Sequence, residues 1–436
     1  MNKKEFARRR RAIMDDMGEG SIAILPAAPV RLRNRDVEYP YRQDSDFYYV
    51  TGFDEPEAVA VLMPNRKRGE FVMFCRERDP EMELWNGARS GLSGACTDYG
   101  ADDAFPIGDV DDILPGLLEN QARVYYAMGY DSDFDQHMIG WVNRVRTRSK
   151  AGVSSPAEFV ALDNVLHEMR LVKSTTEIRA MTRAMEISTD AHLRAMGACR
   201  PGVAEYQIEA ELNYAFMRGG SRRAAYPSIV AGGANACVLH YIDNRDSLRD
   251  GDLLLIDAGA EYDYYASDIT RSFPVNGRFS KAQRALYEVV LEAQEAAIEQ
   301  VQPGNHWNEP HEAAVEVLAQ GLVTLGLLKG NVSAIIKKER YRKFYVHRTG
   351  HWLGMDVHDV GDYKIGGEWR VLEPGMVMTV EPGLYVGAGD KRVARKWWNI
   401  GIRIEDDILV TRDGNKVLSS GVPKSVDDIE AIVGSG

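Results

Sequence analysis

The chain has 436 residues, 44% of them apolar and 27% charged, a composition typical of a globular protein with room for two or more domains. Its net charge is −12 with basic residues spread along the chain, which argues against a nucleic acid or an anionic membrane surface as partner. No run of about 18 apolar residues occurs, so we expect no transmembrane helix.

The N-terminus, MNKKEFARRRRAIMDDMGEG, is basic but runs into acidic residues rather than an apolar segment. It therefore does not match a Sec or twin-arginine signal. The four cysteines are scattered without CxxC spacing, so the pattern indicates neither a zinc knuckle nor a disulfide framework. Free thiols in a reducing compartment are the simplest interpretation, and we expect a cytoplasmic protein.

Residues 1–171 contain short apolar, β-branched runs that alternate with helical stretches, which predicts a small α/β domain. The expected strands are residues 21–25, 58–63, 71–75 and 124–127. Two other stretches, residues 36–53 and 84–89, are dense in aromatic and charged side chains. Each could be a packed strand edge or part of a binding surface.

A second domain is predicted over residues 172–436. Ser174 with Glu177 three residues later forms a capping-box pattern that opens a helix, which ends at the Arg-Pro-Gly sequence of residues 200–202. A second helix is expected over about 204–217, followed by strands near 228–231 and 236–241. Ser280 caps a further helix, and another begins near Pro310, a residue that is acceptable in a first helical turn.

Residues 253–271, LLLIDAGAEYDYYASDITR, read as a β-hairpin with a Gly and polar break. Folded symmetrically about Tyr262 and Asp263, the hairpin would place Asp257 directly opposite Asp268. Two carboxylates so close, with Cβ atoms roughly 5 Å apart, require a shared proton or a cation between them. Two unrelated acids in a solvated loop are the simpler alternative.

The pattern repeats later in the chain. With one constant offset, residues 374–383 match residues 250–259, so that Glu381 takes the place of Asp257 and Gly383 that of Gly259. The next strand, residues 401–410, carries Glu405 as the first hairpin carries Asp268. Such an internal repeat predicts two related halves, each with two helices and an acid-bearing hairpin. Related by a pseudo-twofold axis, the hairpins would direct four carboxylates to one centre.

Four converging carboxylates imply a bound cation. The segment YVHRTGHWLGMDVHD, residues 345–359, adds imidazoles at His347, His351 and His358, although three histidines could also form a polar sheet edge. Carboxylate-rich ligation with one nitrogen favours Mn²⁺, with Co²⁺, Zn²⁺ or Fe²⁺ as alternatives. Two metals about 3.5–4 Å apart generate a bridging hydroxide at neutral pH, which is the chemistry of metal-assisted hydrolysis.

Taken together, the two aspartates, the segment HRTGHWLGMDVHD, Glu381 within TVEPGLY and Glu405 within IRIEDD resemble the ligand motifs of the pita-bread metallopeptidases. The resemblance is greatest to bacterial aminopeptidase P (Xaa-Pro aminopeptidase). It extends over nearly the whole chain, including YPYRQDSDFYYVTGFDEPEA, HEMRLVKSTTEI and LHYIDN. Residues 386–398 agree least with the family pattern, which leaves peptide-length preference open.

The resemblance implies a creatinase-like N-terminal α/β domain followed by a pita-bread domain, assembled as a homotetramer or dimer. It implies release of the N-terminal residue from peptides with proline in second position, using two Mn²⁺ per subunit and a metal-bridging hydroxide. The implied metal ligands are Asp257, Asp268, His351, Glu381 and Glu405. Glu381 would also carry a proton to the leaving proline nitrogen.

Further roles are implied by the same resemblance. His240 and His358 match the pair that contacts the substrate carbonyl and stabilises the developing oxyanion. Arg403 is implied as a catalytic residue, on the same strand face as Glu405 because their spacing is even. Substrate-binding roles are implied for Asp36, Trp85, His347 and Tyr385, with Trp85 reaching the site of a neighbouring subunit.

Other functions share part of this pattern. Prolidase has the same five ligands but cleaves only dipeptides, and residues 39–47 and 84–89 favour the aminopeptidase. Methionine aminopeptidase lacks so large an N-terminal domain, and creatinase has substituted ligand positions. A metal-free pita-bread module that binds peptides or partner proteins is an alternative of another class, against which the intact ligand set argues.

Overall fold

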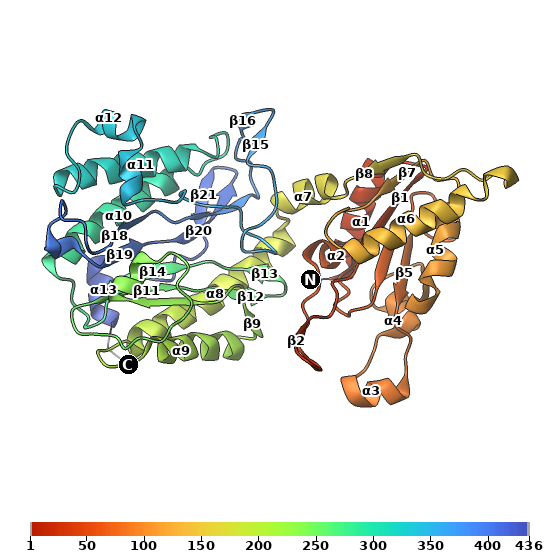
Figure 1. The fold of residues 1–436 in the computed structure, drawn as a ribbon, viewed down its shortest axis with the longest axis horizontal. Coiled ribbons are helices and arrows are strands. Elements are labelled where there is room, and N and C mark those ends of the chain that lie inside the picture. Colours follow the sequence, from red (N-terminus) through yellow and green to blue (C-terminus); the bar gives the residue numbers. More distant parts are fainter. Residues whose placement is uncertain (1, 434–436) are drawn as a thin grey trace. The chain divides into compact units, whose positions relative to one another are not determined.

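The computed structural model describes residues 2–433, and the chain divides into two compact units with the boundary between Met169 and Arg170 (Figure 1). The N-terminal unit is built on a six-stranded mixed sheet in the order β6-β5-β4-β1-β7-β8. Its strands are β1 (Ser21–Pro26), β4 (Val59–Leu62), β5 (Phe71–Cys75), β6 (Asp103–Pro106), β7 (Arg123–Tyr125) and β8 (Glu158–Val160). The four strands predicted from apolar runs are all present in this sheet.

Helices surround this sheet because its strands are apolar on both faces. The helices of the unit are α1 (Lys3–Met17), α2 (Ser45–Thr51), α3 (Pro80–Asn86), α4 (Gly91–Thr97), α5 (Val110–Leu118), α6 (Ser132–Arg146) and α7 (Asp163–Leu171), with 3₁₀ turns η1 (Ile107–Asp109) and η2 (Ser149–Ala151). Leu114 of α5 and Trp141 of α6 pack on Ile22 and Phe74 in the core. The predicted α/β class of this part is confirmed.

The two aromatic and charged stretches of the N-terminal unit are not packed strand edges. Residues 36–53 contain the end of an exposed hairpin, β2 (Leu32–Asn34) with β3 (Val37–Glu38), and then helix α2. Asp44 caps α2 by accepting a hydrogen bond from the Phe47 N–H. Residues 84–89 include the end of α3, which buries none of its side chains.

In the C-terminal unit, two helix pairs lie on opposite sides of a set of small sheets (Figure 1). The first pair is α8 (Thr175–Ala198) with α9 (Glu205–Arg218), and the second is α10 (Lys281–Gln300) with α11 (Glu309–Thr324). The capping box predicted at Ser174 and the helix cap predicted at Ser280 are both formed, and Ser280 forms a capping box as well. Shorter helical segments are α12 (Val332–Lys337), α13 (Val426–Ile432), η3 (Gly233–Cys237), η4 (Arg340–Lys343) and η5 (Arg395–Trp397). The strand predicted at residues 236–241 is wrong, because η3 and a loop occupy this stretch.

The strands of the C-terminal unit follow the predicted repeat. One half has the sheet β10-β11-β14 and the small sheet β13-β12-β9, and the other has the sheet β17-β20-β21 and the pair β18-β19. Their bounds are β9 (Arg223–Ala224), β10 (Ile229–Gly232), β11 (Leu253–Asp257), β12 (Ala260–Tyr262), β13 (Tyr265–Ala266), β14 (Thr270–Pro274), β17 (Val377–Val380), β18 (Gly383–Val386), β19 (Ile400–Arg403), β20 (Asp406–Thr411) and β21 (Gly414–Val417), with an outlying hairpin of β15 (Lys364–Ile365) and β16 (Glu368–Trp369). Each acid-bearing hairpin is thus broken midway, with its outer and inner parts in different sheets.

The register of the first hairpin differs from the symmetric one that we predicted. Tyr262 pairs with Tyr265, and Asp257 pairs with Thr270 instead of Asp268. The turn residues are Asp263 and Tyr264, both with positive φ (51° and 70°), as a type I′ hairpin turn requires. Tyrosine is an unusual residue for such a turn, which is why the sequence did not reveal it.

The break in the first hairpin depends on a glycine. A Cβ on Gly259 would lie 1.7 Å from the carbonyl oxygen of Ser267, so the two chains approach too closely there for any side chain. In the second hairpin the pairs Val380 with Asp406 and Gly383 with Arg403 share one register. This register places Glu381 opposite Glu405, both within the break between the paired strands.

Candidate active site

Twelve residues of the C-terminal unit line a cavity of about 240 Å³. They come from both hairpins, from the loop that follows η3, and from the histidine-bearing segment, which lies between η4 and β15. The lining residues are Leu239, His240, Asp257, Asp268, His347, Arg348, Gly350, His351, His358, Glu381, Arg403 and Glu405. The structure therefore brings together nine of the twelve site residues that the sequence predicted, and Tyr385 contacts two of these nine.

The four predicted carboxylates lie where the paired strands of the hairpins stop. Asp257 is the last residue of β11, and Asp268 precedes β14; Glu381 and Glu405 occupy the corresponding breaks of the second hairpin. Backbone bonds join the two halves here, since the Glu405 N–H donates to the Thr270 carbonyl at 3.0 Å. The Thr270 hydroxyl donates to Glu405 Oε2 at 2.6 Å. These contacts fix the relative position of the two pairs of acids.

His351 is placed as a metal-ligating imidazole would be. Its Nδ1 lies 2.9 Å from the Trp352 carbonyl oxygen and donates to it, which fixes the orientation of the ring. Burial alone would lower the pKa of His351, but Asp268 and Glu381 raise it to about 9. Nε2 points at the acids, 3.3 Å from Asp268 Oδ2 and 3.7 Å from Glu381 Oε1. The ligand atoms of Asp268, His351 and Glu405 all lie within 4.8 Å of one another.

Three carboxylates of this cluster have raised pKa values. Burial and the charge of Asp257 raise the pKa of Asp268. Burial raises the pKa of Glu381 to about 7, even though His351 and Arg403 act to lower it. Burial together with the charges of Asp268 and Glu381 raises the pKa of Glu405 well above its usual range.

The donor set fits divalent metal. Carboxylate oxygens with one imidazole nitrogen are ligands that Mn²⁺, Co²⁺, Zn²⁺ and Fe²⁺ accept in proteins. A bound cation would favour the ionised form of every carboxylate whose pKa burial now raises. The residues present therefore fit the metal centre that the sequence predicted.

Arg403, Tyr385 and His347 form one hydrogen-bonded chain beside the acids. Arg403 Nη2 donates to Asp257 Oδ2 at 2.5 Å, and its Nη1 donates to the Tyr385 hydroxyl at 3.0 Å. That hydroxyl lies 2.8 Å from His347 Nε2. Burial and the charge of Arg403 lower the pKa of His347 to about 4, so its imidazole stays neutral at neutral pH. The chain joins Asp257 to His347 across the cavity lining.

His240 and His358 present imidazole donors to the cavity from two different loops. The His358 ring stands edge-on to the His351 ring, with 4.4 Å between the ring centroids. Burial and the neighbouring His351 lower the pKa of His358, which favours its neutral form. A neutral imidazole can donate one hydrogen bond to a developing oxyanion.

Tyr226 is a site residue that the sequence analysis missed. Its hydroxyl lies 2.6 Å from Asp257 Oδ1 and 2.5 Å from Asp268 Oδ1, so one O–H proton serves both carboxylates. Burial and the charges of these two acids raise its pKa well above the usual value and keep the proton in place. No motif surrounds Tyr226 in the sequence, and only the fold brings it here.

We expect Tyr226→Phe to weaken metal binding or activity about 10–100-fold, the usual effect of losing a partner of a metal ligand. Metal titration of the purified protein, with peptidase activity as the readout, measures the effect. Tyr287→Phe is the control, because Tyr287 is a buried tyrosine whose hydroxyl donates to the Lys424 carbonyl, outside the cavity lining. Equal metal affinities in the two variants would contradict the role of Tyr226.

A buried ion cluster fixes the loop that carries His358. The next residue, Asp359, accepts from Arg170 Nη2 at 2.6 Å and from Lys173 Nζ at 3.0 Å. Burial alone would raise the pKa of Asp359, but the two cations hold it below its usual range. A Cβ on Gly354 would lie 2.0 Å from Asp359 Oδ2, so glycine leaves room for this carboxylate.

Asp359→Asn is expected to cost about 1–3 kcal/mol of stability, because it leaves a buried cation poorly paired. We also expect a fall in kcat of roughly tenfold, since small displacements of positioned groups are costly. Thermal unfolding and steady-state kinetics measure the two effects. Asp356→Asn is the control, because Asp356 shares Arg170 but its side chain is 39% exposed. An effect of the same size in both variants would contradict the prediction.

Asp36 and Trp85 belong to the N-terminal unit and do not line the cavity. Asp36 lies in the turn between β2 and β3 and is exposed. Trp85, on α3, is 78% exposed. The structure thus leaves their predicted substrate contacts untested.

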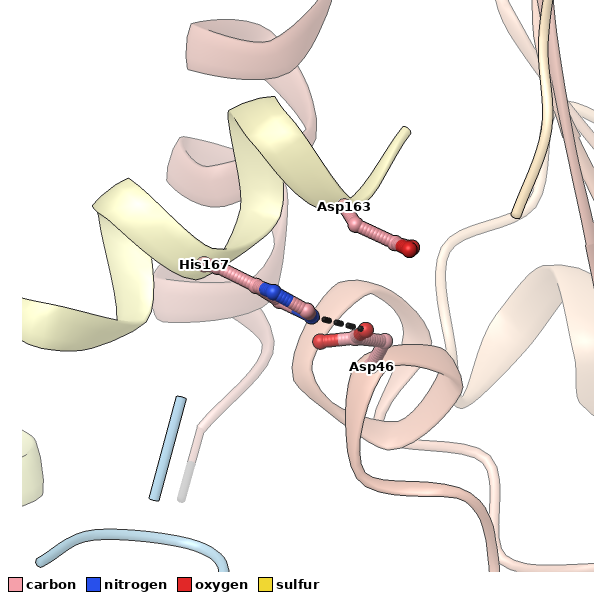
Figure 2. A group of neighbouring side chains, drawn as sticks. All are labelled: Asp46, Asp163 and His167. Carbon is pink, nitrogen blue, oxygen red and sulfur yellow. Dashed lines mark hydrogen bonds and ion pairs between the residues drawn. The ribbon is translucent and has the colours of Figure 1, made fainter. Parts of the chain in front are cut away.

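The N-terminal unit holds a second group with ligand-like side chains, Asp46, Asp163 and His167 (Figure 2). Asp163 and His167 are one turn apart on α7, and His167 Nε2 points at Asp46 Oδ2 of α2, 3.2 Å away. This ion pair ties α7 to α2. Because these residues do not line the cavity described above and His167 joins two helices, we assign the group a structural role.

Comparison with known proteins agrees with this geometry. Residues 179–412 match the model of metallopeptidase family M24, and residues 6–125 match that of the aminopeptidase P N-terminal domain. The chain belongs to the aminopeptidase P branch of family M24. Within this family it is 45% identical over 434 residues to Xaa-Pro aminopeptidase of Escherichia coli, covering 99% of this chain and 98% of that one.

Solved structures of aminopeptidase P share the whole fold. Aminopeptidase PepP of Pseudomonas aeruginosa is 61% identical, with a TM-score of 0.99 over 99% of this chain and 98% of that one. A zinc-substituted E. coli aminopeptidase P in complex with product is 45% identical, with a TM-score of 0.96 over 99% and 98% of the two chains. The predicted two-domain aminopeptidase P fold is confirmed. Among residues 2–433, no helix has the length and apolar character needed to span a membrane.

Proposed function

We propose that this protein is a metallo-aminopeptidase that releases the N-terminal residue from peptides with proline in second position. The observation that carries the proposal is the convergence of four carboxylates and an imidazole on one cavity, which also holds His240, His358 and Arg403. The names of the full-length relatives support the substrate class. We place the catalytic domain at residues 172–436 and the N-terminal domain at residues 1–171.

The proposed metal ligands are Asp257, Asp268, His351, Glu381 and Glu405, holding two Mn²⁺ ions. Four carboxylates are more than one ion needs, which supports the count of two, and their oxygen-rich set supports Mn²⁺ over softer metals. Bound divalent metal supplies Lewis acidity and lowers the pKa of water, so that peptide hydrolysis can proceed at neutral pH.

The remaining groups act on the peptide. The imidazoles of His240 and His358 donate to the carbonyl oxygen of the first residue as negative charge develops there. Water adds to the carbonyl carbon, and the bond from that carbon to the proline nitrogen breaks. Glu381 takes up the proton of the water on its carboxylate and delivers it to the leaving nitrogen. Arg403 holds Asp257 in place, and Tyr385 and His347 orient the substrate.

The selectivity for proline follows from the shape of the proline residue. A bond to proline has no N–H, and the ring fixes φ near −65°. A general aminopeptidase site that requires that N–H therefore rejects the bond. A site walled by imidazole and aromatic surfaces, as His347 and Tyr385 provide here, packs against the ring instead.

We further propose that the protein works in the cytoplasm as a homotetramer or homodimer. Helix α3 buries none of its side chains, and its Leu84 is 83% exposed. Exposed apolar side chains on an otherwise unpacked helix favour a contact with another protein surface. In this proposal Trp85 reaches the site of a neighbouring subunit, and Asp36 contributes to the substrate site.

The decisive experiment compares hydrolysis of a Xaa-Pro-Pro peptide with that of Gly-Pro, using metal-free protein with and without added Mn²⁺. Metal-dependent release of the first residue from the longer peptide is the expected result. Cleavage of Gly-Pro alone would instead assign the protein as a dipeptidase with the same site. If neither peptide is cleaved although metal is demonstrably bound, the proposed function is wrong.

A further inference from the structure

Arg348 lines the cavity yet takes no part in the chemistry described above. It follows His347 in sequence, three residues before the ligand His351, and its side chain is exposed at the cavity. Its two side-chain contacts are neutral: Nη2 donates to the Asn308 amide oxygen, and the guanidinium lies 4.8 Å from the centre of the Trp369 ring. Arg348 is thus a fixed cation at the edge of the site.

The charge of Arg348 is uncompensated within the structure. In residues 2–433 no ion pair joins it to a carboxylate, whereas Arg403 of the same cavity is bound to Asp257. Lys364 adds a second cation on the same indole, with Nζ 4.2 Å from the Trp369 ring centre, and it too has no acidic partner in that part of the chain. Burial, followed by the charge of Arg348, lowers the pKa of His311 to about 4. A positive rim therefore borders an acidic cavity.

The size of the cavity limits which part of a peptide reaches the rim. At about 240 Å³ it is smaller than most small-molecule sites, which run from about 300 to 1,000 Å³. It can enclose the residues on either side of the scissile bond, and the next residue must lie at its edge. A guanidinium held between an amide and an indole presents a planar fork of donors that matches a carboxylate.

We infer that Arg348 binds a carboxylate carried by the residue that follows proline, and so favours tripeptides with a free C-terminus among Xaa-Pro substrates. This inference rests on the proposed function, since it specifies the substrate of the same cavity. A C-terminal carboxylate and an acidic side chain offer the same chemistry to the guanidinium. The peptides used in the test separate the two.

The test measures kcat and KM of the metal-loaded protein for Ala-Pro-Ala, for Ala-Pro-Ala amide and for Ala-Pro-Asp amide. The unmodified enzyme should prefer the free acid to the amide about 10–100-fold in kcat/KM, as for one hydrogen-bonded charge pair. Arg348→Gln should lower kcat/KM for the free acid by a similar factor, mainly through KM, and leave the neutral amide within about threefold. A preference for the Ala-Pro-Asp amide over the neutral amide would identify a side-chain carboxylate as a second ligand of Arg348.

Two controls separate this role from a general loss of charge or structure. Arg342→Gln removes a cation of the same segment that pairs with Glu339 and does not line the cavity, and it should preserve the preference for the free acid. Arg348→Lys keeps the charge without the fork and should retain part of the preference. Calorimetric titration with Pro-Ala and Pro-Ala amide measures the interaction of Arg348 with the carboxylate without turnover.

The inference is overturned if the unmodified enzyme cleaves acid and amide equally well, or if Arg348→Gln leaves their ratio unchanged. Equal losses for both peptides would also overturn it, because they indicate a structural role. Failure of the proposed function is a distinct result, in which the unmodified, metal-loaded protein cleaves none of the three peptides.

Discussion

Asp268→Asn is expected to lower the metal-dependent peptidase activity by about 10³-fold or more, because bound metal supplies several kcal/mol of transition-state stabilisation. The substitution removes one carboxylate from the group that Asp268 forms with His351 and Glu405. Activity at saturating Mn²⁺ and the stoichiometry of bound metal measure the effect. Asp263→Asn is the matched control: Asp263 lies in the turn of the same hairpin, where asparagine tolerates its positive φ.

In the absence of metal, the same variant should not lower the stability of the protein. Burial and Asp257 raise the pKa of Asp268, so the folded state holds this proton more tightly than the unfolded state. Raising the pH above the ordinary carboxyl pKa of about 4 therefore favours unfolding of the metal-free protein. Asparagine removes that charge, and metal-free Asp268→Asn should melt no lower than the unmodified protein at pH 7. Full metal-dependent activity, or a lower melting temperature without metal, would contradict this prediction.

Arg271→Ala is expected to cost about 3–5 kcal/mol of stability, the usual effect of removing one partner of a buried ion pair. Arg271 is fully buried, and its Nη2 pairs with Asp406 Oδ1 at 2.7 Å. Its guanidinium also donates to the carbonyl oxygens of Glu405 and Val422. Burial alone would raise the pKa of Asp406, but Arg271 and Lys424 hold it at about 2. Denaturant unfolding of the variant measures the loss.

The control for this prediction is Arg284→Ala. Arg284 pairs with Glu288 on the surface of α10, and both side chains are about half exposed. An exposed pair of this kind contributes far less to stability than a buried one. If the two variants lose similar stability, the buried network around Asp406 is not the stabilising element that we describe.

Local patterns in the sequence predicted much of this structure because the responsible forces are local. The capping box at Ser174 and the helix cap at Ser280 depend only on residues within one helical turn. The apolar runs of the N-terminal sheet are visible directly in the sequence. Because the two hairpins match at one constant offset, the position of Asp257 predicted Glu381 as its counterpart. Ligand motifs in chain order then located His351 and Glu405, and the structure brings these residues to one cavity.

Features that depend on tertiary packing were not predicted. The hairpin register shifted because Asp263 and Tyr264 both adopt positive φ, which tyrosine does not favour. Tyr226 lies 31 residues before Asp257, and Arg170 lies 189 residues before Asp359, so no sequence spacing links either pair. Arg348 lies between two histidines of a motif, and nothing in the sequence marks it as a site residue. Such contacts form only in the folded chain, so no periodic pattern in the sequence reveals them.

The distribution of the ligands over two hairpins has a consequence for biosynthesis. Asp257 and Asp268 leave the ribosome well over a hundred residues before Glu405, and the bonds that join the halves include Asp268 N–H to Asp407 Oδ2 at 3.0 Å. A complete metal site therefore cannot exist on a nascent chain until both halves have docked. Tyr226 and Arg403 both bind Asp257, and Arg403 belongs to the second half of the domain. Metal uptake is then a late step that reports completed folding.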